Sequence, residues 1–104
     1  MHPRSIALAA VLSAVTAPAL AQAPDPNLGR NLAATCANCH GTNGHAQGAV
    51  ASLAGLPKAD IVQKMAEFRD GKRPATIMHQ LAKGYSDAQI EAVAAFFARQ
   101  PAAR

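Results

Sequence analysis

The residues Cys-Ala-Asn-Cys-His at positions 36–40 decide the fold of this 104-residue chain. The pattern Cys-x-x-Cys-His is typical of the attachment site of c-type haem. Residues three apart share one face of a helix, so Cys36 and Cys39 can each form a thioether to one vinyl group of the same haem. His40 then lies beneath the iron as its proximal ligand. We therefore predict a helix ending in this motif and one covalently bound haem c.

Two other chemistries use paired cysteines. A structural zinc site needs four ligands, and the chain has only two cysteines, so zinc is disfavoured. A redox-active pair of thiols is expected near a βαβ pattern, whereas the remaining sequence is typical of short helices without a strand run. The thiol-disulfide alternative stays open, but haem attachment is the favoured interpretation.

Residues 1–21 have the pattern of a secretory signal peptide. A short basic start precedes an apolar run over residues 6–15, and an Ala-x-Ala site ends at Ala21. The apolar run is too short to span a bilayer, although an uncleaved anchor is the alternative. We expect cleavage after Ala21, release of the mature chain into the periplasm and no stable membrane insertion afterwards. Haem attachment to cysteines on the exported side of bacterial membranes agrees with this expectation.

The mature chain, residues 22–104, has the size of one small domain. It lacks Trp, and aromatic residues are only 4% of the whole sequence, so few large side chains can fill an interior. A haem would provide that apolar bulk, with short helices packed around it in an all-α fold. Nine basic and six acidic residues remain, a net charge of +3. No basic and aromatic interleaving indicates a nucleic-acid partner.

Hydrophobic spacing and helix signals predict three main helices. The first begins near Asn27 or Leu28 and runs into the haem motif; Gly29 is either a place where another helix could approach closely or simply a tolerated small residue. Gly41 to Gly48 then form a glycine-rich loop without hydrophobic periodicity. The second helix follows Pro57 and ends near Asp70 and Gly71, and its apolar stripe is Ile61, Val62, Met65 and Phe68.

The third predicted helix covers residues 86–99. Ser86 and Gln89 have the spacing of a capping box, and Pro101 follows the end of the helix. Its predicted buried face is Ile90, Val93, Ala94 and Phe97.

The sixth iron ligand decides between electron transfer and reactive chemistry. Met78 is the best candidate, because it follows the loop around Pro74 and enters a short segment ending at Gly84. Met65 fits the apolar stripe of its helix and is expected in the core. His79 is expected on the surface or near a haem propionate, and His45 is expected to be a solvated loop residue. A His and Met pair saturates the iron, which favours a one-electron carrier that is not itself an enzyme; an open haem would indicate an enzyme or sensor.

Several longer stretches carry a family resemblance. Residues 36–44, 52–55, 68–78 and 82–90 resemble the class I cytochromes c, and most of all the haem subunits of flavocytochrome c sulfide dehydrogenases. The resemblance implies an all-helical fold, haem attachment to Cys36 and Cys39, and axial ligation by His40 and Met78. It also implies an FAD-containing flavoprotein partner that oxidises sulfide and passes electrons to the haem. The alternative is a free diffusible carrier serving an oxidase or reductase.

Two features of this resemblance concern contacts between residues that are distant in the sequence or the surroundings of charged side chains. Relatives commonly have Pro where this chain has Ala51, and the carbonyl there accepts a hydrogen bond from the proximal histidine; we expect the carbonyl of Ala51 to keep that role. The cations Lys72, Arg73 and Lys83 could dock a partner, clamp a propionate or form a solvated rim, and the sequence leaves these open.

Overall fold

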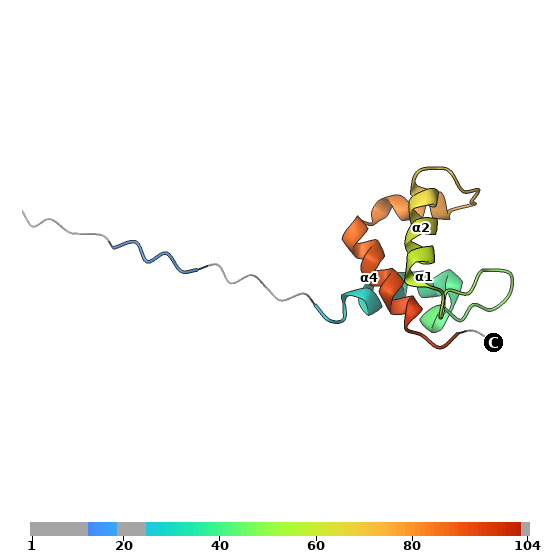
Figure 1. Ribbon diagram of the computed structural model, residues 1–104, viewed down its shortest axis with the longest axis horizontal. Coiled ribbons are helices and arrows are strands. Elements are labelled where there is room, and N and C mark those ends of the chain that lie inside the picture. Colours follow the sequence, from blue (N-terminus) through green and yellow to red (C-terminus); the bar gives the residue numbers. More distant parts are fainter. Residues whose placement is uncertain (1–12, 19–24, 103–104) are drawn as a thin grey trace, which may run out of the picture.

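The computed structural model describes residues 13–18 and 25–102, and over these residues it is all-α, as predicted. The elements follow in the order α1 (Leu28–His40), η1 (Thr42–Gly44), α2 (Lys58–Arg69), α3 (Met78–Leu81), η2 (Ala82–Gly84) and α4 (Asp87–Ala98). Helices α1, α2 and α4 form the body of the domain (Figure 1). The loop before α2 lies at one end of that helix, and the loop that leads to α3 lies at the other.

Most of the predicted signal peptide, including the expected cleavage site at Ala21, lies outside the described residues. Residues 13–18 are exposed and have no regular secondary structure. Within the described ranges, no helix has both the length and the apolar character needed to cross a membrane.

Helices α1 and α4 cross at Gly29, which confirms a close approach here over a merely tolerated small residue. A methyl group on Gly29 would overlap the carbonyl oxygen of Ala92 and would lie 3.3 Å from Cβ of Phe96. The missing side chain therefore lets the backbones of the two helices come together. This crossing joins the start of the motif-bearing helix to the last helix of the chain.

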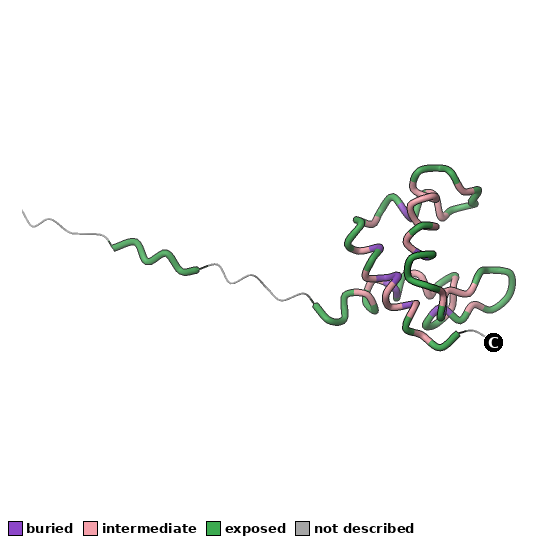
Figure 2. The backbone as a smooth tube through the Cα atoms, in the orientation of Figure 1, coloured by how far each residue is buried: buried purple, intermediate pink, exposed green. Residues whose placement is uncertain are grey.

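Helix α4 confirms the predictions made for residues 86–99. Ser86 Oγ accepts a hydrogen bond from the amide of Gln89 at 3.2 Å, and Oε1 of Gln89 accepts one from the amide of Ser86 at 2.9 Å. The four apolar residues predicted to be buried are all buried: Ile90, Val93, Ala94 and Phe97. In Figure 2 they make α4 the most buried helix of the domain.

The hydrophobic core lies where α1, α2 and α4 meet. Its buried members are Ala33, Ile61, Val93, Ala94 and Phe97. Phe97 is the one large side chain among the described residues that is fully enclosed, at 1% exposure. The core is therefore built mainly from small residues, as the low aromatic content predicted.

The loop after the motif folds back onto the end of α4. The predicted irregular loop at 41–48 contains the 3₁₀ turn η1. The carbonyl of Gly44, at the end of η1, accepts hydrogen bonds from the amides of Leu53 and Ala54, and the amide of Gly55 donates to Phe97. A methyl group on Gly44 would lie 2.9 Å from the ring of Phe97. These contacts hold residues 45–55 beside the C-terminal end of α1.

Candidate haem site

Both cysteines lie in the last turns of α1, one helical turn apart. Cys36 is half-buried and Cys39 is exposed, and neither is in a disulfide. Cys36 lines a small apolar cavity with Met65, Tyr85, Ile90 and Val93, and burial raises the pKa of its thiol. Cys39 instead lines a different, open pocket beside the loop that follows α1. One thiol therefore faces the interior, and the other faces solvent.

His40 is the last residue of α1, and its ring is held by a hydrogen bond. Nδ1 lies 2.6 Å from the carbonyl oxygen of Ala51, so Nδ1 carries the proton that is donated. The other ring nitrogen, Nε2, is then the one with a lone pair for a metal. This bond confirms the expectation that Ala51 supplies the carbonyl even though the proline ring is missing.

Gly41 makes the turn that follows the motif possible. Its φ angle is +79°, and a side chain here would overlap the carbonyl oxygen of His45. Its amide also closes the helix by donating to the carbonyl of Ala37 at 3.0 Å. Only glycine accommodates both the positive φ and the close approach, and the chain can then return to place Ala51 against His40.

Met78 is the first residue of α3 and is half-buried. The helix continues through η2 to Gly84, so the short segment predicted after the Pro74 loop is confirmed. Helix α3 packs against α2. Ligation of iron by Met78 stays a prediction. Met65 packs against the hydrophobic core, as predicted, and also borders the cavity that Cys36 lines.

The two remaining histidines of the domain differ. His45 is exposed in its loop, as predicted. His79 is half-buried, and its Nδ1 is buried without a hydrogen-bond partner, which disagrees with a surface position. Its burial results from the packing of α3, which leaves no pattern in the sequence. A position of His79 near a haem propionate stays a prediction.

Sequence reasoning missed the contacts of Tyr85. Its hydroxyl lies 2.9 Å from Oγ1 of Thr35, which joins α1 to the residue just before the capping box of α4. Tyr85 also lines the cavity beside Cys36. Residues 35 and 85 are far apart in the chain and match no short motif, so only the fold pairs them.

The three cations whose role the sequence leaves undecided, Lys72, Arg73 and Lys83, have different surroundings in the structure. Lys72 and Lys83 are exposed. Arg73 forms an ion pair with Glu67, with Nη2 2.6 Å from Oε2, and its guanidinium lies 5.8 Å from the centre of the Phe68 ring. Arg73 is therefore bound to groups of the domain itself, although its side chain is still 39% exposed.

The residues present fit a covalently attached haem. Two thiols one turn apart, an imidazole with a fixed tautomer and an apolar cavity meet at the end of one helix. Within the part of the chain that the structure describes, no group of three or more His, Cys, Asp or Glu residues could hold a metal ion by itself.

Comparison with known proteins agrees with this site. The family described as "Cytochrome C oxidase, cbb3-type, subunit III" matches residues 25–97. The chain belongs to the cytochrome c family, a class of electron-transfer proteins whose cofactor is haem c. Its fold is that of the class I cytochromes c.

Several known proteins are similar to the chain. It is 34% identical to the cytochrome subunit of sulfide dehydrogenase of Chlorobaculum tepidum, over 81% of this chain and 79% of that protein. The structure of thiosulfate dehydrogenase from Marichromatium purpuratum matches 74% of this chain with a TM-score of 0.68 and 32% identity. Cytochrome c4 of Acidithiobacillus ferrooxidans matches 61% with a TM-score of 0.58 and 38% identity. The chain spans only 19% and 37% of those two solved chains, respectively.

Proposed function

We propose that this protein transfers single electrons through one haem c attached to Cys36 and Cys39, with His40 and Met78 as axial ligands. The observation that carries the proposal is the 2.6 Å hydrogen bond from His40 to Ala51 at the end of the helix that bears both cysteines. A hydrogen bond on Nδ1 orients the ring and leaves Nε2 to the iron.

The side chains of this protein would hold and tune the cofactor. The bound haem supplies a one-electron iron couple, and thioether ligation by methionine favours its reduced state. With both His40 and Met78 holding the iron, the haem would have no position open to oxygen or peroxide. The protein therefore passes electrons between partners and needs no acid, base or nucleophile of its own.

We further propose that the electron donor is an FAD-containing flavoprotein that oxidises sulfide and that both proteins act in the periplasm. Support comes from the Chlorobaculum tepidum relative, which is named as a cytochrome subunit of sulfide dehydrogenase and which this chain matches over most of its length. A freely diffusing carrier that serves an oxidase or reductase is the second candidate, because the chain is also similar to cytochrome c4, whose name does not make it a dehydrogenase subunit.

Intact mass spectrometry of the exported protein tests attachment and processing. The mature chain should begin at Gln22 and carry the added mass of one haem that acid-acetone does not extract. A mature chain with two free thiols and no haem would overturn the cytochrome assignment of this site.

Visible spectroscopy of two methionine variants tests the sixth ligand. Met78→Ala should abolish the weak sulfur-to-ferric-iron charge-transfer band and open the iron to cyanide. Met65→Leu should keep the band, because it exchanges similar volumes at the edge of the core. Loss of the band in Met65→Leu together with its retention in Met78→Ala would refute the assignment.

Purification from periplasm followed by stopped-flow reduction tests the partner. The protein should be recovered with a flavoprotein and should be reduced rapidly after sulfide is added. Recovery of a lone monomer that a membrane cytochrome complex reduces quickly, but a flavoprotein with sulfide does not, would favour the free carrier.

A further inference from the structure

The segment that carries Met78 begins at a well-defined end of α2. Gly71 has a φ angle of +73°, its amide donates to the carbonyl of Phe68, and the amide of Lys72 donates to the carbonyl of Glu67 at 2.9 Å. These two bonds form a Schellman motif. The backbone therefore leaves α2 in a fixed direction directly before Arg73.

An ion pair between Arg73 and Glu67 joins the start of this segment to α2. Nε and Nη2 of Arg73 lie 2.8 and 2.6 Å from Oε2 of Glu67, in the last turn of α2. The other carboxylate oxygen, Oε1, accepts a hydrogen bond from Nε2 of Gln63 at 3.0 Å. Both bonds lower the pKa of Glu67, which agrees with a charged carboxylate held on both sides.

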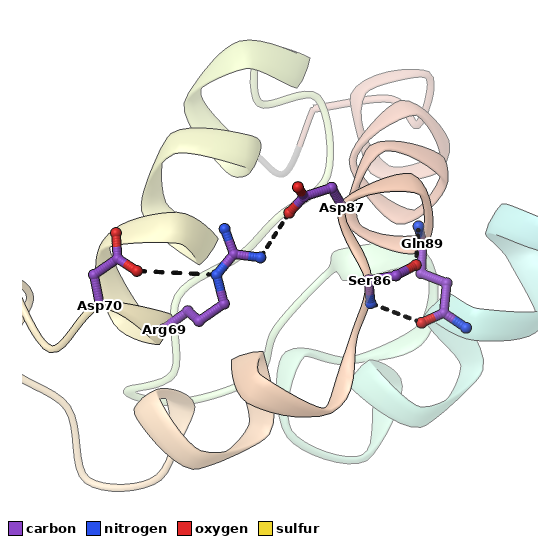
Figure 3. Close-up of polar contacts among 5 residues, drawn as sticks. All are labelled: Arg69, Asp70, Ser86, Asp87 and Gln89. Carbon is purple, nitrogen blue, oxygen red and sulfur yellow. Dashed lines mark hydrogen bonds and ion pairs between the residues drawn. The ribbon is translucent and has the colours of Figure 1, made fainter.

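A second ion pair lies at the end of the segment, where the chain enters α4. Its α2 residue, Arg69, is two residues after Glu67. Nη1 of Arg69 lies 2.6 Å from Oδ1 of Asp87, the first residue of α4, while Nε of Arg69 is 4.0 Å from Oδ1 of Asp70. Figure 3 shows Arg69 between the two carboxylates, with the capping box of Ser86 and Gln89 beside Asp87. The contact with Asp87 raises the pKa of Arg69.

The segment between the two ion pairs packs against α2 but contains no long helix. Its regular structure is a four-residue helix and a 3₁₀ turn, elements too short to be stable alone. Elements this short depend on contacts outside themselves, and the two ion pairs are such contacts at the two ends of the segment.

We propose that the Arg73–Glu67 and Arg69–Asp87 ion pairs act together as a clamp that keeps the Met78 segment closed and so sets how often Met78 leaves the iron. This inference rests on the proposed ligation by Met78. The four residues are positioning residues, because they act on the ligand through the segment between them.

The test measures how fast cyanide binds to the ferric, haem-loaded protein, because cyanide enters only when Met78 has left the iron. Exposed ion pairs each contribute only a small stabilisation. Arg73→Gln and Arg69→Gln should therefore each raise the rate by up to about fivefold, and the double variant should raise it by roughly the product of the two increases.

Lys58→Gln is the matched control. Lys58 also joins α2 to α4, with Nζ 2.6 Å from Oε2 of Glu91, but this pair lies at the first turn of α2, away from the Met78 segment. The control removes an ion pair between the same two helices and should leave the cyanide rate unchanged; its free energy of unfolding is measured beside those of the clamp variants. This comparison separates a positioning effect from a general loss of stability.

The outcomes also separate this inference from the proposed ligation. If the wild type shows the charge-transfer band, and both arginine variants bind cyanide no faster than Lys58→Gln, the clamp is refuted and the ligation by Met78 stands. If the band is absent from the wild type or survives Met78→Ala, the ligation is refuted and the clamp with it. Faster binding in the arginine variants alone supports the clamp.

Discussion

Gly29→Ala should destabilise the protein, because α1 and α4 touch at this position. The new methyl group would overlap the carbonyl oxygen of Ala92, well inside the relaxed carbon–oxygen distance of about 3.3–3.6 Å. It would also lie 3.1 Å from the carbonyl carbon of Ala92. The obstructing atoms belong to the backbone of α4, so a whole helix has to move. Overpacking of this kind costs about 1–3 kcal/mol. Alanine regains about 1 kcal/mol of helix propensity over glycine.

The net expectation is a loss of up to about 2 kcal/mol, which corresponds to a fall in Tm of up to roughly 16 °C for a domain of this size. Thermal unfolding of the haem-loaded protein, followed by circular dichroism, measures it. Gly84→Ala is the matched control, because a methyl group there meets nothing within 4 Å and its φ is not positive. The reasoning is refuted if the Tm of Gly29→Ala equals or exceeds that of Gly84→Ala.

Three further perturbations test other parts of the structure. Ser86→Ala removes the side chain that caps α4 and should cost about 1 kcal/mol in urea unfolding; an unchanged midpoint would contradict the role of the capping box. Phe97→Ala empties the centre of the core and should cost about 3–5 kcal/mol, and a loss below 1 kcal/mol would mean that the core lies elsewhere. The pKa of Glu67 is below its ordinary value of 4.5, so the unfolded chain takes up the proton first as the pH falls. The stability that this carboxylate contributes is therefore complete above pH 4.5 and is lost as the pH falls through the folded pKa; Glu67→Gln should flatten that part of the stability profile, and an unaltered profile would exclude the interaction.

Patterns confined to a few neighbouring residues predicted the helical framework well. The first helix begins at Leu28, the second follows Pro57, and the capping box at Ser86 opens the fourth, as expected. These features depend on hydrogen bonds and side-chain contacts between residues three or four apart, which the sequence displays directly. The same locality made the motif at residues 36–40 informative, because its three functional side chains lie within one helical turn and a half.

The carbonyl that orients His40 was predictable only through the family resemblance, since Ala51 has no side-chain group that marks it. Its oxygen reaches His40 because Gly41 turns the chain and Gly44 holds the returning loop. The structure thus supplied the geometry for a contact that no property of residue 51 alone would indicate.

By itself the sequence determined the helices, the buried face of α4 and the residues suited to attach a haem, because each depends on local spacing. Only the tertiary structure decided that Arg73 binds Glu67, that Arg69 reaches Asp87 and that a nitrogen of His79 is buried. Arg69 and Asp87 are 18 residues apart and share no periodic pattern. Their pairing depends on the path of the Met78 segment between α2 and α4, and charged side chains on a surface have many partners available until the packing of the helices leaves one within reach.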